Sequence, residues 1–113
     1  MKRKLFFGFI AASALLFSNC GSSKKTTSAP KTTFANDITT IVQSKCAPCH
    51  IPDKGGNKKA YDVYDNVKTD IDNIIRRIEL NPGERGFMPF RNEKLDAATI
   101  AVFKKWKEDG MPQ

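Results

Sequence analysis

Two cysteines and a histidine lie within five residues, in the segment Cys46-Ala47-Pro48-Cys49-His50. Cysteines three positions apart can present both sulfurs on one side of a turn, within reach of the two vinyl groups of a haem. The imidazole of His50 comes next and would be held over the iron as its fifth ligand. The pattern Cys-x-x-Cys-His is typical of c-type haem attachment. We therefore predict one covalent haem c, with Cys46 and Cys49 as thioether residues and His50 as the proximal iron ligand.

Other chemistry of the two cysteines matches the sequence less well. A structural zinc site normally takes four side-chain ligands, whereas Cys46, Cys49 and His50 are the thiol and imidazole donors of the predicted domain. A redox dithiol of the thioredoxin type opens a helix that follows a strand, and no strand is predicted before Cys46. A disulfide between Cys46 and Cys49 stays possible for haem-free protein.

Residues 1–19 have the pattern of a secretory signal peptide. A basic start at residues 2–4 precedes an apolar run over residues 5–17, as in the n-region and h-region of an export signal. This run is shorter than the roughly 20 residues that span a bilayer, and a buried helix is the alternative. Cys20, followed by Gly21, resembles the lipobox cysteine of bacterial lipoproteins. We therefore expect an exported chain, anchored to a bacterial membrane by lipidated Cys20, with its domain in the periplasm or on the extracytoplasmic face.

Residues 20–33 offer no large apolar side chain after the cysteine and are predicted to form a disordered tether to a domain of residues 34–113. The net charge of +7 belongs mostly to the part before this domain. Of the 19 Lys and Arg residues, six precede Phe34, which leaves 13 against 12 Asp and Glu. A domain so close to neutral lacks the footprint of nucleic-acid binding, so no nucleic-acid partner is expected.

The domain shows helical spacing of apolar residues and no alternating strand pattern, so we predict an all-α fold. Asn36 or Asp37 is expected to cap a first helix that leads into the Cys-x-x-Cys-His segment. Two short helices follow, with Asp70 as the cap of the second. A last helix is expected to begin after Asp96 and to stop at Gly110. The supporting apolar positions are Ile38, Ile41, Val42, Tyr61, Tyr64, Val67, Ile71, Ile74, Ile75, Ile78, Ile100, Phe103 and Trp106.

The predicted domain resembles the class I c-type cytochromes over its whole length. The resemblance is carried by the segment Cys46–His50, by the later Met88-Pro89 pair and by the last helix, which contains Trp106. It implies a small cytochrome c-like domain of about four helices wrapped around one haem. It also implies that Met88 is the distal iron ligand, on the side of the haem opposite the histidine.

Two methionines are candidates for the distal position once Met1 is removed. Met88 lies in a loop where Gly86 and Pro89 could direct the backbone towards the haem. Met111 lies two residues from the end of the chain. We predict Met88 as the ligand, and simple packing in the core is its alternative role.

A haem ligated by His50 and Met88 has no vacant axial position, which suits electron transfer better than oxygen or peroxide chemistry. The chain has a single histidine, so the distal side also lacks an obvious proton shuttle. We therefore expect a monomeric, membrane-tethered single-electron carrier and not an enzyme, with a redox partner protein or a respiratory complex as its partner. The alternative is an open-site haem protein for gas sensing or weak peroxidase activity. Arg85, Arg91 and the tyrosines are candidates to contact the haem propionates.

Overall fold

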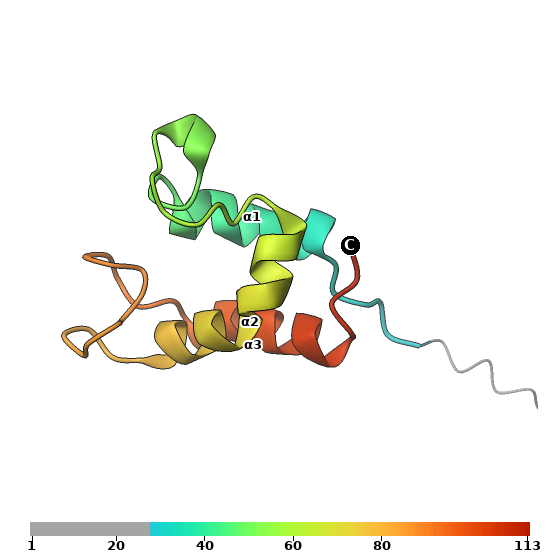
Figure 1. Ribbon diagram of the computed structural model, residues 1–113. Helices are drawn as coiled ribbons and strands as arrows, with labels where there is room; N and C mark the ends of the chain where they lie inside the picture. Colours follow the sequence, from blue (N-terminus) through green and yellow to red (C-terminus); the bar gives the residue numbers. More distant parts are fainter. Residues whose placement is uncertain (1–27) are drawn as a thin grey trace, which may run out of the picture.

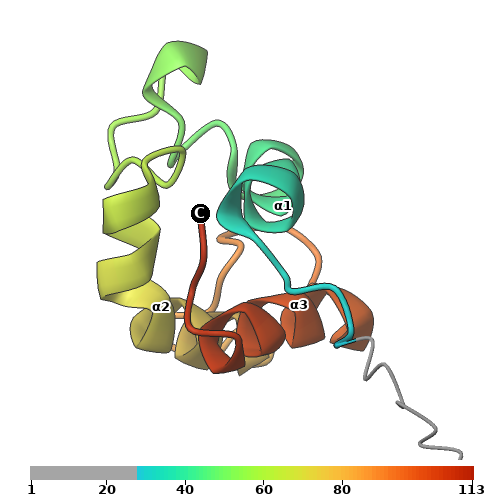
Figure 2. The same cartoon turned by 90° about the vertical axis from the view of Figure 1, so that its right-hand side faces the viewer.

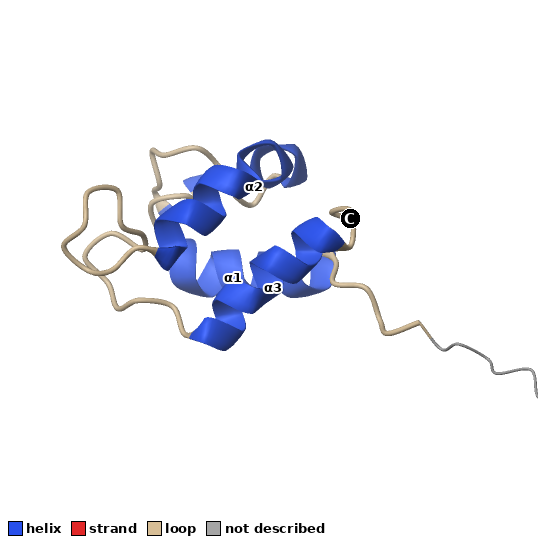
Figure 3. Cartoon of the chain, turned by 90° about the horizontal axis from the view of Figure 1, so that it is seen from below, coloured by secondary structure: helices blue, strands red, loops and turns tan. Residues whose placement is uncertain are grey.

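A computed structural model describes residues 28–113, and within them the fold consists of helices, turns and loops without a strand (Figures 1 and 3). The elements are η1 (Phe34–Ile38), α1 (Thr39–Ile41), η2 (Val42–Cys46), η3 (Pro52–Lys54), α2 (Tyr64–Glu79) and α3 (Ala97–Glu108). Because η1, α1 and η2 follow one another without a break, they form one helix, here called the first helix. The described residues are therefore all-α, as predicted, but they hold three helices and one short turn in place of about four helices.

The predicted signal peptide, Cys20 and the tether up to residue 27 lie outside the described residues. Within residues 28–113, no helix has the length and apolar character needed to cross a bilayer. The described chain makes contact with the domain two residues before the predicted boundary at Phe34. Thr32 is buried, and its backbone N–H donates to the Asp109 carboxylate at 2.8 Å.

The first helix begins earlier than predicted, because its cap is Thr33. The Thr33 hydroxyl oxygen accepts from the Asn36 N–H at 3.3 Å, and the Asp37 carboxylate accepts from the Thr33 N–H at 2.7 Å. These reciprocal bonds satisfy backbone donors that the helix start leaves free. The predicted cap at Asn36 or Asp37 is therefore wrong, since both residues lie inside the first turn. The apolar stripe is confirmed, with Ile38 and Val42 buried.

One continuous helix, α2, replaces the two short helices predicted around Asp70. Its buried residues Val67, Ile71, Ile74 and Ile78 form a single stripe along one face. Asp70 lies in the interior of α2, where its carboxylate accepts a hydrogen bond from the Tyr61 hydroxyl. The prediction of a second helix start at Asp70 is therefore wrong, because this carboxylate bonds a side chain instead of backbone N–H groups.

The last helix, α3, has the predicted start and stop. The Asp96 carboxylate accepts from the Thr99 N–H at 2.6 Å and caps the start. At the end, Gly110 adopts φ +87°, the left-handed conformation that favours glycine. The N–H groups of Gly110 and Met111 then donate to the carbonyls of Lys107 and Trp106 at 3.2 and 2.9 Å. The predicted buried face is confirmed by Ile100, Phe103 and Trp106.

The helices enclose an apolar core in which α3 packs against both η1 and α2, as Figure 2 shows from the tether side. Phe34 and Trp106 lie 6.1 Å apart by ring centroids, and Tyr64 packs against both rings edge-on. The two ends of the described chain join here, because the Phe34 N–H and the Trp106 indole N–H both donate to the Pro112 carbonyl, at 2.9 and 2.8 Å. This aromatic end lies away from the loop that connects α2 to α3 (Figure 1).

Asp96→Ala is expected to lower the urea midpoint of unfolding at about pH 7, because α3 loses its cap. Hydrogen bonds from Thr99 lower the pKa of Asp96 below its ordinary 3.8. The stabilisation is therefore present above about pH 4 and is lost as the pH falls through the folded-state pKa. Urea titrations at about pH 7 and about pH 2 measure this difference. Asp96→Ser, which keeps a capping oxygen, is the control, and equal midpoints for Asp96→Ala and the wild type at about pH 7 would contradict the assignment.

Candidate functional site

A cavity of about 300 Å³ is lined by none of the residues of the aromatic end, Phe34, Tyr64 and Trp106. Its walls come from the end of the first helix, the turn after it, one face of α2 and the loop of residues 81–92. The apolar lining consists mainly of Ala47, Ile74, Ile78, Met88, Pro89 and Leu95. Phe90 also lines the cavity, although 62% of its surface is exposed. An apolar cavity with a few polar groups is the usual form of a small-molecule or cofactor site.

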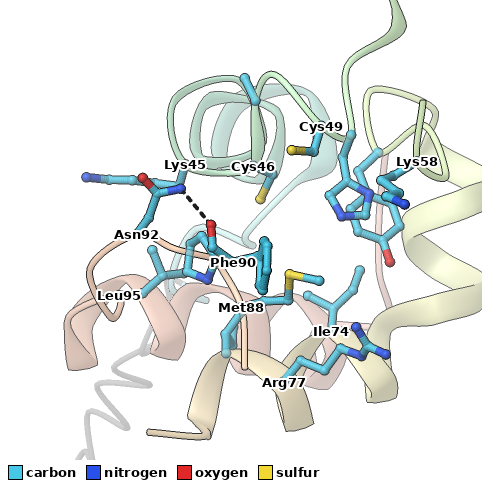
Figure 4. Close-up of a pocket in the computed structure, with 15 residues that line it drawn as sticks. Lys45, Cys46, Cys49, Lys58, Ile74, Arg77, Met88, Phe90, Asn92 and Leu95 are labelled. Carbon is cyan, nitrogen blue, oxygen red and sulfur yellow. Dashed lines mark hydrogen bonds between the residues drawn. The ribbon is translucent and has the colours of Figure 1, made fainter. Parts of the chain in front are cut away.

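Three sulfur atoms face this cavity from two sides. Figure 4 shows the Cys46 and Cys49 thiols on the side of the first helix and the Met88 thioether on the opposite side, pointing into the same space. Both thiols are free, so no disulfide joins Cys46 to Cys49. Cys46 is partly buried and Cys49 is exposed, which places Cys49 nearer the solvent. The structure thus brings together the two predicted thioether residues and the predicted distal ligand.

The turn after the first helix brings His50 to the same cavity. Its backbone N–H donates to the Cys46 carbonyl at 3.2 Å, so the helix ends in one further turn. The ring Nδ1 lies 2.7 Å from the Lys59 carbonyl oxygen, which can only accept, so Nδ1 carries a proton. In the neutral ring this leaves Nε2 with a free lone pair, the form in which imidazole binds a metal. His50 lines the cavity together with both cysteines and Met88.

Tyr61 and Asp70 form a second layer behind the imidazole. The rings of His50 and Tyr61 are stacked, with centroids 4.2 Å apart and planes inclined by 4°. The Tyr61 hydroxyl donates to the Asp70 carboxylate. Burial is the main cause that raises the pKa of Tyr61, and its hydrogen bond to Asp70 raises the pKa further, so the hydroxyl stays a donor. The sequence pattern predicts Tyr61 as a core residue and gives no sign of its contact with His50.

A glycine allows the loop after His50 to close against the cysteine turn. A Cβ atom on Gly56 would overlap the carbonyl oxygens of Pro48 and Cys49. The Lys58 N–H donates to the Cys49 carbonyl at 3.0 Å, and the Tyr61 N–H donates to the His50 carbonyl at 2.9 Å. The loop therefore holds the backbone of the cysteine turn by direct contact as well as by hydrogen bonds.

Met88 lies in the loop of residues 81–92, and a hydrogen bond to α2 holds its backbone. Its N–H donates to the Arg77 carbonyl at 3.2 Å, and its neighbours Phe87 and Pro89 are buried. Gly86 just before them has φ +95° and supplies the turn in the backbone. Met111 instead lies at the aromatic end, where its carbonyl accepts from the Tyr64 hydroxyl at 2.7 Å. Of the two candidates, Met88 lines the cavity and Met111 does not.

Basic side chains supply the charge of the cavity. Lys45, Lys58 and Arg77 line it, and no Asp or Glu is among the lining residues. The Arg77 Nε atom is buried and has no hydrogen-bond partner among the described residues. Arg85 and Arg91, the arginines considered from the sequence, are exposed and do not line the cavity. Arg77 could have been found from its place beside Ile74 and Ile78 on α2, and it equips this wall for an anionic group.

Within residues 28–113, no three His, Cys, Asp or Glu side chains gather in a group that could hold a metal ion. Comparison of the chain with family models, with curated proteins and with solved structures finds no match in any of the three sets. The chemistry of the cavity therefore has to be inferred from its own residues.

Gly56→Ala is expected to lower the free energy of unfolding by about 1 to 3 kcal/mol, because the new methyl group has to displace the cysteine turn. Gly55→Ala is the matched control. Gly55 has φ +84° but open space around it, so its substitution costs the backbone strain alone, about 1 kcal/mol. Urea unfolding of the three exported proteins measures the difference, and a smaller loss for Gly56→Ala than for Gly55→Ala would show that the turn is not held by this contact.

In chain produced without haem, Cys49 is expected to react with iodoacetamide faster than Cys46. Cys46 is shielded, and burial raises its pKa from 9.0 to about 11, so its reactive thiolate becomes abundant only near that pH. Peptide-resolved mass spectrometry at several pH values gives both rates, with denatured protein as the control. A Cys46 rate that already levels off at about pH 9 would contradict this environment.

Proposed function

We propose that this chain is a monohaem c-type cytochrome that carries single electrons. In this proposal Cys46 and Cys49 hold the haem by thioether bonds, His50 is the proximal iron ligand and Met88 is the distal ligand. The observation that carries it is the convergence of two free thiols, an imidazole and a thioether on one apolar cavity, with the thiols and the thioether on opposite sides.

The residues that line the cavity are chemically suited to a haem. Its apolar lining suits a porphyrin face, and the unpartnered Arg77 Nε suits a propionate. About 300 Å³ lies at the small end of the range for cofactor pockets. The exposed residues Cys49 and Phe90 mark its open side. One edge of a bound haem would therefore reach the surface, where a partner protein could approach it.

Each residue has a distinct part in this proposal. Cys46 and Cys49 would each hold the haem through a thioether bond to one of its vinyl groups. The Lys59 carbonyl keeps the proton of His50 on Nδ1 and leaves Nε2 for the iron. The Arg77 carbonyl fixes the backbone of Met88. When bound, the haem would supply one-electron chemistry, with His50 and Met88 as the residues that would hold its iron.

The described chain joins the domain away from the cavity, which suits a membrane-tethered carrier. The described chain enters the domain at Thr32 and Thr33, at the aromatic end and far from loop 81–92 (Figure 1). If Cys20 carries the lipid, the chain from the anchor joins the domain at the aromatic end and leaves the cavity free. A redox partner protein or an extramembrane part of a respiratory complex could then reach the cavity of a monomeric carrier.

Optical spectra of protein exported together with a haem-attachment system test the proposal. The wild type is expected to show covalent haem with a low-spin spectrum and no rapid binding of carbon monoxide when reduced. Met88→Ala should keep the haem but bind carbon monoxide rapidly, because one axial position becomes free. Met111→Ala is the matched control and should behave as the wild type.

Two results would contradict parts of this proposal. Absence of haem from wild-type protein would overturn the function itself. Rapid carbon monoxide binding by the wild type would replace the closed electron carrier by an open-site haem protein.

A further inference from the structure

Two contacts fix the imidazole of His50, and one of them would be enough to set the direction in which Nε2 points. The hydrogen bond from Nδ1 to the Lys59 carbonyl, at 2.7 Å, sets where Nε2 points. This hydrogen bond alone leaves the ring free to rotate about that direction, because the terminal torsion of histidine has broad minima. The flat stack with Tyr61, 4.2 Å between centroids and 4° between planes, removes this second freedom. The plane of the imidazole is therefore defined as well as its direction.

Tyr61 can serve as such a support because it is itself held at both ends. Its backbone N–H donates to the His50 carbonyl at 2.9 Å. Its side chain is buried, and its hydroxyl donates to Asp70 in the interior of α2. The α2 helix also contributes Ile74, Arg77 and Ile78 to the cavity. The residue that anchors Tyr61 therefore lies on the same helix as one wall of the cavity.

We propose that Tyr61 is a positioning residue that sets the ring plane of the axial ligand His50, with Asp70 as its anchor. The inference rests on the proposed function, since the plane of the imidazole matters when its Nε2 binds iron. The plane of an axial imidazole decides which iron d orbitals overlap with the π system of the ligand. Tyr61 and Asp70 thereby control the electronic anisotropy of the iron through the imidazole.

Electron paramagnetic resonance of the oxidised, haem-loaded protein tests this inference, because its g-values report the orientation of the axial ligands. Tyr61→Phe keeps the stacked ring and is expected to keep the g-values, with broader lines because the anchor is lost. Asp70→Ala is expected to broaden the lines in the same way. Tyr61→Leu removes the ring and is expected to shift the g-values. If the Tyr61→Leu variant does not accumulate, Tyr61→Met is used in its place with the same expectation.

Tyr64→Leu is the matched control. Tyr64 is a tyrosine packed at the aromatic end, so its loss should lower the denaturation midpoint without a shift in the g-values. Unchanged g-values and line widths in all the Tyr61 and Asp70 variants would overturn the positioning role and leave Tyr61 as a core residue. Absence of covalent haem from the wild type would instead overturn the proposed function, so the two failures are distinguishable.

Discussion

The geometry of the site depends on one constraint, the tight turn by which the chain leaves the first helix at Cys46 and directs two thiols and an imidazole to one cavity. The His50 N–H bonded to the Cys46 carbonyl and the Ile51 N–H bonded to the Pro48 carbonyl close this turn, at 3.2 and 3.0 Å. Gly56 lets the following loop pack directly on the turn. Without these contacts the sulfurs and the imidazole would sample many orientations, and ordering them on a cofactor would cost conformational entropy.

The rest of the fold provides the wall that faces this turn. The α2 helix presents Ile74, Arg77 and Ile78, and the Arg77 carbonyl holds the loop that carries Met88. The aromatic end fastens the first helix to α3 at the far side of the domain, by contacts among Phe34, Tyr64 and Trp106. The aromatic contacts thus lie where the two ends of the described chain meet, and loop 81–92 supplies part of the cavity wall.

The sequence predicts those features that depend on interactions between residues close together in the chain. The Asp96 cap and the Gly110 stop act within one helical turn, so residue type and spacing were sufficient for both. Asp70 has the residue type of a cap, but its partner is a tyrosine nine positions earlier, and no local pattern reveals such a bond. Cys46, Cys49 and His50 were found because they are neighbours in sequence. The stacking of Tyr61 on His50 depends on the packing of α2 against the turn, which no local pattern reveals.

Mass spectrometry of the peptide that spans Cys46 to Cys49, taken from protein exported together with a haem-attachment system, shows whether the two cysteines hold a haem. One haem is expected on this peptide, bound through both sulfurs, so that neither cysteine reacts with an alkylating reagent after denaturation. Two cysteines that are free or joined to each other, with no added haem mass, would contradict it.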